Sequence, residues 1–485
     1  MIMPAVTASP TWPVFSGGNA GVIGLRAMDG GRPHRLGMSR LWADPMVRNS
    51  LFLIGSSGVQ AAVGFVFWIV VARLYTPADV GRASSLISAV SLISYLALFG
   101  LSTTLVRYLP TAPNRNELIT AGLCLVTASG TVIGLLYVFA LPILAPRLAF
   151  VEQRPLLAVG FVLLAAAAAV NVLTDSVFIS SRQAKYTAVT DGGIGGLAKI
   201  GSAIALSAGG AYSIFLASAG SLAMAAASSL VIMLVSMRWR PLPAGIFRTL
   251  RPVLMFSGAS YASSLLMLAP NLVVPLILLD RLGAPAAAYY FVAFQLALLL
   301  MTAIYAVEQT LMTEGSQAEV DWPDLLRRSR RLVLALFLPL CAVLVLVAHW
   351  VLLAFGRTYS EHATICLMLI AAGTVPIGAN NWLQTVLRLS GRLRATVWTS
   401  AVYGAAICGL AWFLAPHGLT ALAAAWPLGG IVAAAAAAVA CRGLLRTRVR
   451  GSLAGRQEYG PTKYRASQGS GRTESAMGNS RAHSH

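Results

Sequence analysis

The sequence predicts an all-α integral membrane protein with about twelve transmembrane helices, and three observations lead to this fold class. Of the 485 residues, 57% are hydrophobic and only 11% are charged, whereas soluble domains have about 45–50% and about 25%. The apolar residues form runs of about 20, the length that crosses a bilayer as a helix. The charged residues lie in short clusters between these runs. This pattern excludes an ordinary soluble enzyme.

About twelve apolar runs can be delimited along the chain. The expected spans are 50–72, 84–106, 119–144, 156–180, 192–208, 212–236, 253–279, 286–309, 332–355, 363–387, 395–415 and 419–441. Residues 1–47 precede them as an N-terminal segment. Residues 442–485 are basic and rich in Gly and Ser, a composition that cannot bury a core. We expect them to form a disordered cytoplasmic tail.

The lysines and arginines predict the orientation of the chain, because cytoplasmic loops carry an excess of them. With the spans above, 29 of the 36 basic residues lie on one side, six lie on the other, and Lys199 lies within a span. Both termini are therefore expected in the cytoplasm. This topology also explains the net charge of +20 without a nucleic-acid partner.

The five cysteines lie far apart, within or at the end of apolar runs, and have no CxxC or Cys/His spacing. The sequence therefore predicts neither a disulfide framework nor a metal site. No cofactor is expected, since nothing in the chain resembles a nucleotide site. Gly193–Lys199 has the outline of a phosphate loop but lacks its final Gly and its Ser/Thr; Gly192 and Gly196 instead form a GxxxG helix-packing pattern.

An internal repeat divides the chain into a first half, residues 48–240, and a second half, residues 241–441. The segment Arg48–Ser57 recurs as Arg251–Ser260, 203 residues later, with the pattern R-x-x-L-x-x-x-G-x-S. Arg73–Ala78 recurs as Arg281–Ala286, 208 residues later. Six spans per half is an even number, so both halves enter the membrane from the same side as parallel repeats. Two such six-helix lobes around a central cleft are typical of alternating-access transporters.

Four stretches carry a resemblance to a known family: Gly55–Ser57, Leu74–Gly81, Gly100–Tyr108 and Pro285–Gln295. Through them the chain resembles the multidrug/oligosaccharidyl-lipid/polysaccharide (MOP) exporter superfamily, and within it the Wzx-type oligosaccharide flippases and polysaccharide biosynthesis membrane proteins of bacteria. The resemblance covers about residues 45–441. It implies that spans one, two, seven and eight line the cleft.

The resemblance also implies a transporter of the bacterial inner membrane, not an enzyme. Its cargo would be an undecaprenyl-diphosphate-linked oligosaccharide, flipped from the cytoplasmic to the outer leaflet for cell-surface polysaccharide synthesis. The expected partners are this lipid-linked oligosaccharide, membrane lipids, and the polymerase and glycosyltransferases of polysaccharide synthesis.

Arginines near the cleft are candidates for binding the diphosphate, because the guanidinium group offers paired donors to phosphate oxygens. Arg48, Arg107 and Arg251 lie at the expected cytoplasmic ends of spans one, two and seven. The alternative is that they only anchor these spans at the membrane surface. Arg73 and Arg281 lie at repeat-equivalent outer positions, against the positive-inside rule. They either contribute to function, or snorkel or pair with Asp79 or Asp280.

Uncharged polar residues in the same spans are candidates for binding sugar hydroxyls: Gln60, Asn271 and Gln295. Hydrogen bonds between helices are the alternative use of such residues. Span seven also contains Pro270 and Pro275, which predict a bend that faces the cleft, since proline frees backbone carbonyls. The pair Asn380 and Asn381 in span ten is assigned to packing.

Ionic residues inside spans are expensive and are candidate functional sites. Asp175 and Lys199 lie at similar expected depths on the hairpin of spans four and five, where they are placed to form an ion pair. The pair either stabilises the first half or takes part in ion coupling. Glu308, near the cytoplasmic end of span eight, is a third coupling-ion candidate; the alternative is an interfacial acid in contact with water.

Three other functions compete with the flippase. A cation-coupled multidrug or metabolite exporter of the same superfamily would favour an acidic cleft. A membrane glycosyltransferase or ligase is disfavoured because the expected outer loops have at most about a dozen residues. A scaffold without transport activity would bind lipid-linked precursors and recruit the synthesis machinery through the basic tail.

Overall fold

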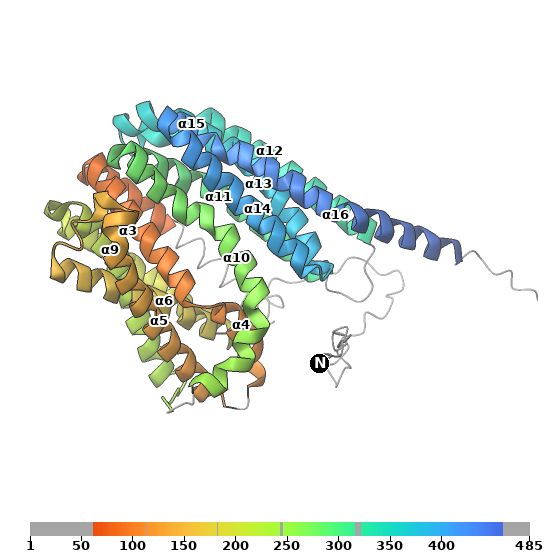
Figure 1. Cartoon of the computed structure of the whole chain (residues 1–485), viewed down its shortest axis with the longest axis horizontal. Coiled ribbons are helices and arrows are strands. Elements are labelled where there is room, and N and C mark those ends of the chain that lie inside the picture. Colours follow the sequence, from red (N-terminus) through yellow and green to blue (C-terminus); the bar gives the residue numbers. More distant parts are fainter. Residues whose placement is uncertain (1–61, 113, 182, 243–245, 316–321, 459–485) are drawn as a thin grey trace, which may run out of the picture. The chain divides into compact units, whose positions relative to one another are not determined.

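The computed structural model describes residues 62–112, 114–181, 183–242, 246–315 and 322–458, which are helical almost throughout (Figure 1). All of them belong to one compact unit, Asn49–His485. Within the described residues, nine helical segments are long and apolar enough to cross a membrane, and two shorter apolar helices, Ala62–Leu74 and Phe337–Leu353, accompany them. The prediction of an all-helical membrane protein is confirmed. The count of about twelve spans stays a prediction.

The first half begins, within the described residues, with the helix Ala62–Leu74. It continues with α3 (Pro77–Ala97), α4 (Leu101–Tyr108), α5 (Arg115–Leu144), α6 (Pro155–Ser180), α7 (Ala184–Thr187), the π-helix η3 (Ala188–Gly195), α8 (Gly196–Ala205) and α9 (Gly210–Val235). Thr76 starts α3 as its N-cap, because its hydroxyl accepts a hydrogen bond from the Asp79 amide at 3.2 Å.

Two expected spans of the first half are not continuous α-helices. The run 84–106 is divided into α3 and α4 at Phe99 and Gly100, whose φ angles of 45° and 77° end the helix. The run 192–208 starts inside η3, a π-helix that α8 follows. A Cβ on Gly196 would lie 3.1 Å from Val63 Cγ1. The GxxxG pattern therefore brings this segment close to the helix Ala62–Leu74.

The second half consists of the helices α10 (Ile246–Leu282), α11 (Ala284–Gly315), α12 (Trp322–Leu353), α13 (Arg357–Leu389), α14 (Leu393–Leu414), the short α15 (Leu419–Ala423) and α16 (Ala425–Glu458). Helix α10 runs through Pro270 and Pro275 without a break, and Figure 1 shows it bent rather than straight. Helix α16 extends to Glu458, so residues 442–458 of the expected tail continue a helix; residues 459–485 lie outside the described part.

Helix α3 of the first half packs against α10 and α11 of the second. Tyr261 donates a hydrogen bond to the Tyr95 carbonyl at 2.9 Å, and Ser85 donates a longer one to the Pro275 carbonyl at 3.5 Å. Residue numbers rise along α3 as they fall along α10, so these two helices are antiparallel. We name the two ends of the bundle after residues that lie there: the Gly283 end, where α10 turns into α11, and the Arg388 end, where α13 finishes.

The buried apolar residues show where the halves join. One large cluster contains residues of both halves, among them Phe67 and Trp68 of the first and Tyr290 and Phe291 of the second. The rings of Trp68 and Phe291 are 4.6 Å apart. Toward the Arg388 end, a second cluster contains only first-half residues, and a third, around Leu387, contains only second-half residues. Among the residues whose side chains the structure describes, the halves therefore share a core toward the Gly283 end, and each core at the other end contains residues of one half.

Candidate functional site

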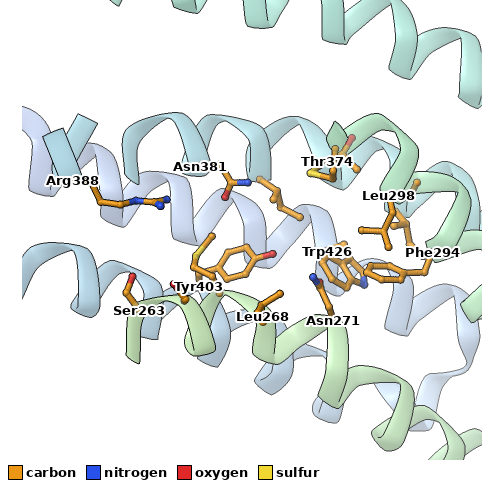
Figure 2. Close-up of a pocket in the computed structure, with 16 residues that line it drawn as sticks. Ser263, Leu268, Asn271, Phe294, Leu298, Thr374, Asn381, Arg388, Tyr403 and Trp426 are labelled. Carbon is orange, nitrogen blue, oxygen red and sulfur yellow. The ribbon is translucent and has the colours of Figure 1, made fainter. Parts of the chain in front are cut away.

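A cavity of about 290 Å³ lies inside the second half, between α10, α11, α13, α14 and α16 (Figure 2). Its polar lining comes from Ser263, Ser264, Asn271, Thr374, Asn381, Arg388 and Tyr403. Figure 2 shows Arg388 at one end of the cavity and Phe294 and Trp426 at the other. Of the described residues that line it, none is Asp or Glu. The cavity can therefore take a neutral or anionic polar ligand, but it offers no counter-ion to a cation.

Helix α13 places three polar side chains in this cavity at intervals of seven residues: Thr374, Asn381 and Arg388. This interval keeps side chains on one helix face. The Asn381 side chain is 5% exposed, and its Oδ1 has no hydrogen-bond partner among the described residues. A buried amide oxygen without a partner is costly, so Asn381 is available to a ligand. Arg388 is exposed at the end of α13.

The aromatic end of the cavity is held rigidly. Trp426 Nε1 donates a hydrogen bond to the Tyr290 hydroxyl at 3.0 Å. The Phe294 ring lies 5.1 Å from Trp426 and 5.7 Å from Tyr290. All three side chains are buried. A Cβ on Gly373 would lie 2.8 Å from Trp426 Cβ, so only glycine allows α13 and α16 to approach this closely. Their packing fixes the Trp426 ring in place.

A second cavity, of about 240 Å³, lies inside the first half, between the helix Ala62–Leu74, the η3–α8 segment and α9. Asp191, Lys199 and Ser221 contribute its polar groups. Lys199 Nζ lies 4.5 Å from the centroid of the Phe67 ring, a cation–π contact. This cavity carries both signs of charge, in contrast to the one in the second half.

The expected ion pair between Asp175 and Lys199 is wrong. Asp175 lies against Asp191 and Thr187 instead, and Asn171 Nδ2 donates a hydrogen bond to Asp191 Oδ1 at 3.3 Å. The π-helix η3 explains the difference, because a helix with a wider turn changes which residues face a neighbouring helix. It turns Asp191 toward α6, and Lys199 lies over Phe67.

The repeat-equivalent arginines at the Gly283 end have different partners. Arg73 reaches the second half: its Nε donates a hydrogen bond to the Ala354 carbonyl at 3.0 Å, and its Nη2 donates one to the Leu353 carbonyl at 3.1 Å. The Arg281 guanidinium lies 3.8 Å from the centroid of the Trp412 ring, and its Nε is 4.0 Å from Asp280. Of the two, only Arg73 bonds across the halves.

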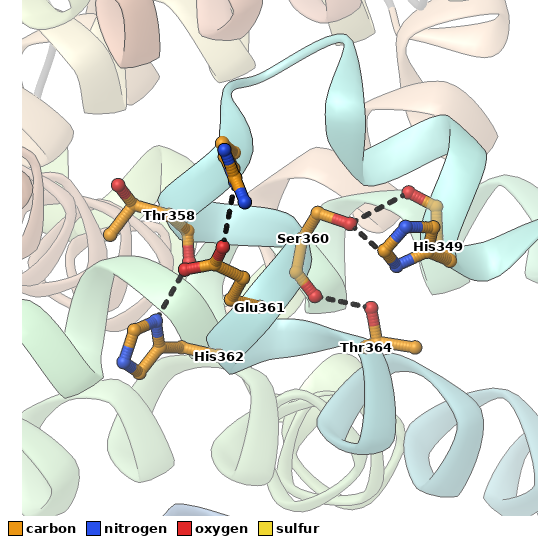
Figure 3. Close-up of polar contacts among 7 residues, drawn as sticks. His349, Thr358, Ser360, Glu361, His362 and Thr364 are labelled. Atoms are coloured by element: carbon orange, nitrogen blue, oxygen red, sulfur yellow. Dashed lines mark hydrogen bonds and ion pairs between the residues drawn. The ribbon is translucent and has the colours of Figure 1, made fainter.

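Polar contacts hold the turn from α12 to α13, whose carbonyls accept the hydrogen bonds of Arg73 (Figure 3). The Ser360 hydroxyl lies 2.8 Å from His349 Nδ1 and donates to the His349 carbonyl at 3.0 Å. Arg357 Nε pairs with Glu361 Oε1 at 2.9 Å, and His362 Nδ1 lies 2.9 Å from the Thr358 carbonyl. This network joins the end of α12 to the start of α13, and so positions the carbonyls that Arg73 binds.

The other predicted site residues fall into two groups. Arg48 and Gln60 lie outside the described residues, and the side chains of Arg107, Arg251 and Glu308, on α4, α10 and α11, also lie outside them. Among those described, Asn271 lines the second-half cavity, and its expected place in the cleft between the halves stays a prediction. Gln295 is half-buried on α11 and is not among the residues that line that cavity.

Three site residues were missed by the sequence interpretation: Asn381, Arg388 and Trp426. Asn380, which is fully buried and does not line the cavity, agrees with the packing role expected for the pair, but Asn381 does not. The seven-residue spacing from Thr374 through Asn381 to Arg388 was the available signal. Trp426 had no signal, since a lone Trp in an apolar run is ordinary core.

Solved structures place this helical arrangement in a known fold. A multidrug resistance MATE family transporter of the MOP superfamily, in an inward-facing conformation, superimposes with a TM-score of 0.65 and 14% identity over 81% of this chain and 96% of its own. The lipid II flippase MurJ, in an inward closed conformation, gives 0.65 and 10% over 81% and 87%. An outward-facing conformation of a multidrug resistance MATE family transporter gives a TM-score of 0.56 and 15% identity over 86% of this chain and 99% of its own.

The fold is thus the one seen in these multi-pass membrane transporters. The model of the family described as "Polysaccharide biosynthesis protein" matches residues 70–364. The chain belongs to this family, which confirms the resemblance noted in the sequence. No curated protein matches the chain with significance.

Proposed function

We propose that this protein flips a polyprenyl-diphosphate-linked oligosaccharide from the cytoplasmic to the outer leaflet, for cell-surface polysaccharide synthesis. Two six-helix lobes, 48–240 and 241–441, act by alternating access around a central cleft. The observation that carries the proposal is the pattern of cores among the side chains that the structure describes: the halves share one core toward the Gly283 end, and each has its own at the Arg388 end. Two bodies joined at one end can separate there when they close at the other.

The basic residues assign the two ends to the two sides of the membrane. By the positive-inside rule the Arg388 end is cytoplasmic and the Gly283 end is external. Halves that join at the Gly283 end then correspond to an inward-facing state. The higher TM-score against the inward-facing MATE transporter, 0.65 compared with 0.56 for the outward-facing one, supports this assignment.

Contacts between the halves support their relation as parallel repeats. In a two-fold arrangement, each contact has a counterpart in which the two halves exchange roles. Trp68 of the first half touches Phe291 of the second. The repeat offset of 208 residues relates Trp68 to position 276 and Phe291 to position 83. These positions lie within two residues of Pro275 and Ser85, which are also in contact. The antiparallel packing of α3 and α10 fits halves that enter the membrane from the same side.

The nature of the second-half cavity favours an anionic, sugar-bearing cargo over a cationic drug. Its described lining contains Arg388, amides and aromatic rings and lacks carboxylates. A site for cationic drugs would need acidic groups, since an unpaired charge is costly inside the membrane. The family match, to a polysaccharide biosynthesis protein, agrees with the sugar-bearing cargo.

We assign ion coupling to the first half, where Asp175, Asp191 and Lys199 lie. Asp191 and Lys199 line its cavity, and Asp175 is in contact with Asp191. Two neighbouring acids in a membrane-embedded site are suited to exchange a proton or a metal cation. Glu308 on α11 stays a further coupling candidate, and Arg48, Arg107, Arg251 and Gln60 stay candidates for contact with the cargo in the cleft.

Deletion of the gene tests the proposal. Lipid-linked oligosaccharides should then accumulate on the inner leaflet, where an externally added glycan-cleaving enzyme cannot reach them in intact spheroplasts. The wild-type gene should restore their exposure. If the deletion causes no accumulation but raises the sensitivity to cationic dyes, the multidrug-exporter function replaces this one.

A further inference from the structure

We infer that the second-half cavity is a subsite for one sugar ring that carries an anionic group on its Arg388 side. The inference rests on the proposed function and adds a definite place and chemistry for part of the cargo. That place lies within one half, among α10, α11, α13, α14 and α16, and not in the cleft between the halves.

The size of the cavity limits what it can hold. Small-molecule sites range from about 300 to 1,000 Å³, and this cavity, at about 290 Å³, lies at the small end. It has room for one ring but not for an oligosaccharide. The remaining sugars and the lipid would therefore stay outside it, on the side where Arg388 is exposed.

The lining combines the two kinds of surface that a pyranose ring presents. Its C–H face is apolar and packs on aromatic side chains, which Phe294 and Trp426 supply at the deep end (Figure 2). Its hydroxyls need donors and acceptors around the rim. Asn271 on α10 and Asn381 on α13 project into the cavity from opposite walls, so an occupant between them can be bonded from both sides.

Asn381 is the strongest single indication of a polar ligand. Asn381 is only 5% exposed, its Oδ1 lacks a hydrogen-bond partner among the described residues, and its side chain lines the cavity. A hydroxyl donor satisfies that oxygen, whereas an apolar occupant such as a prenyl chain leaves the deficit unrelieved. This feature favours a sugar over the lipid tail.

Arg388 supplies the anion-binding element. It lies two turns of α13 beyond Asn381, at the exposed end of the cavity, and no carboxylate lines the described cavity to compete for it. The anion is either the diphosphate that links the first sugar to the lipid or an acidic group on the sugar itself. Both meet the guanidinium through paired hydrogen bonds.

Purified full-length protein in detergent provides the test, with three soluble probes. These are methyl pyranosides, the matching sugar 1-phosphates, and methyl uronosides, each titrated by calorimetry. We expect sugar 1-phosphates or uronosides to bind at least about tenfold more tightly than the neutral methyl pyranosides. Arg388→Gln should abolish this preference, and whichever anionic probe loses affinity identifies the source of the anion. Asn381→Leu should weaken all binding at least tenfold.

The neighbouring Asn380→Leu is the matched control. Asn380 is also buried in α13 and also has an unpartnered Oδ1, but it does not line the cavity. We expect this variant to bind the probes as the wild type does. Asn381→Gln, which keeps the amide, should restore part of the affinity lost in Asn381→Leu. The thermal unfolding midpoint of each variant shows whether it is folded.

The subsite is overturned if no probe binds the wild type, or if Asn381→Leu is folded and binds like the wild type. The proposed function fails by a different result, namely a deletion strain in which lipid-linked oligosaccharides do not accumulate. Binding that depends on Asn381 in a protein without flipping activity would keep the subsite and remove the flippase. Flipping activity in a protein that does not bind the probes through Asn381 would keep the flippase function and remove the subsite.

Discussion

Arg73 Nε of the first half donates a hydrogen bond of 3.0 Å to the Ala354 carbonyl oxygen, just beyond the end of α12 in the second half. The last carbonyls of a helix have no partner within the helix, and they carry the negative end of its dipole. The Arg73 guanidinium donates hydrogen bonds to these carbonyls and places a positive charge at the negative end of the helix dipole, from across the interface. It therefore stabilises the contact between the halves at the Gly283 end, and this contact must break when that end opens.

Replacement of Arg73 should favour opening at the Gly283 end. In Arg73→Gln the charge at the end of α12 is lost, which costs about 0.3–1 kcal/mol at an exposed site. The population open at this end should rise about two- to fivefold. Distances between spin labels on the two halves, measured by double electron–electron resonance, report this population.

Arg281→Gln is the matched control, since Arg281 is the repeat-equivalent residue at the same end. Its guanidinium packs on Trp412 within the second half, so its loss should leave the distance distribution unchanged. An equal shift in both variants would show that net charge at this end, and not the cap on α12, controls the opening.

At Gly81 the backbones of the two halves approach each other closely. A Cβ at this position would overlap the Ala284 carbonyl oxygen, so Gly81→Ala should force α3 and α11 apart and destabilise the state joined at the Gly283 end. Flipping in complemented deletion cells should fall. Gly201→Ala is the control, because its added Cβ meets nothing within 4 Å; a loss of flipping in that variant as large as in Gly81→Ala would remove the steric explanation.

The sequence was sufficient for the membrane fold but not for its interruptions. Apolar runs locate helices because the bilayer requires a fixed apolar length, and this principle holds even where helix packing varies. The break at Phe99 and Gly100 depends on backbone angles that no periodicity encodes. The π-helix over residues 188–195 is likewise not encoded by the apolar periodicity, and with it Asp175 contacts Asp191 and not the expected Lys199.

The candidate site was predicted only in part. Asn271 could be found because it is a polar residue between two prolines in an apolar span, and it lines the second-half cavity. Arg73 could be marked because it opposes the positive-inside rule, but its partners are backbone carbonyls of a distant helix. Trp426 became part of a site only through the packing of α13 on α16, which sequence spacing does not reveal.

Neutralisation of the first-half acids should uncouple transport from its ion gradient. We expect Asp175→Asn with Asp191→Asn to remove the dependence of flipping on an imposed proton or sodium gradient in proteoliposomes, because the site can no longer change charge. Glu361→Gln, at an exposed carboxylate paired with Arg357, should keep the dependence. Gradient-driven flipping that persists in the double variant would place the coupling site elsewhere, with Glu308 the next candidate.

Tyr290 should contribute to the stability of the second half through its hydroxyl. Tyr290→Phe leaves the buried Trp426 Nε1–H without its acceptor, and side-chain hydrogen bonds between membrane helices contribute about 0.6 kcal/mol on average and at most about 1.7 kcal/mol. The thermal unfolding midpoint in detergent should fall measurably. Tyr289→Phe, at a half-buried tyrosine on the same helix, should change it less; an equal fall would argue against the hydrogen bond as the cause.

A reversible cross-link between the halves tests alternating access most directly. Phe65 of the first half and Phe355 of the second have ring centroids 5.5 Å apart. With the five native cysteines replaced by alanine, Phe65→Cys and Phe355→Cys can be joined by a short, reducible thiol cross-linker in proteoliposomes that contain lipid-linked oligosaccharide. The cross-linked protein should stop flipping, and reductant should restore it. Flipping at the full rate while the halves are joined would contradict the account.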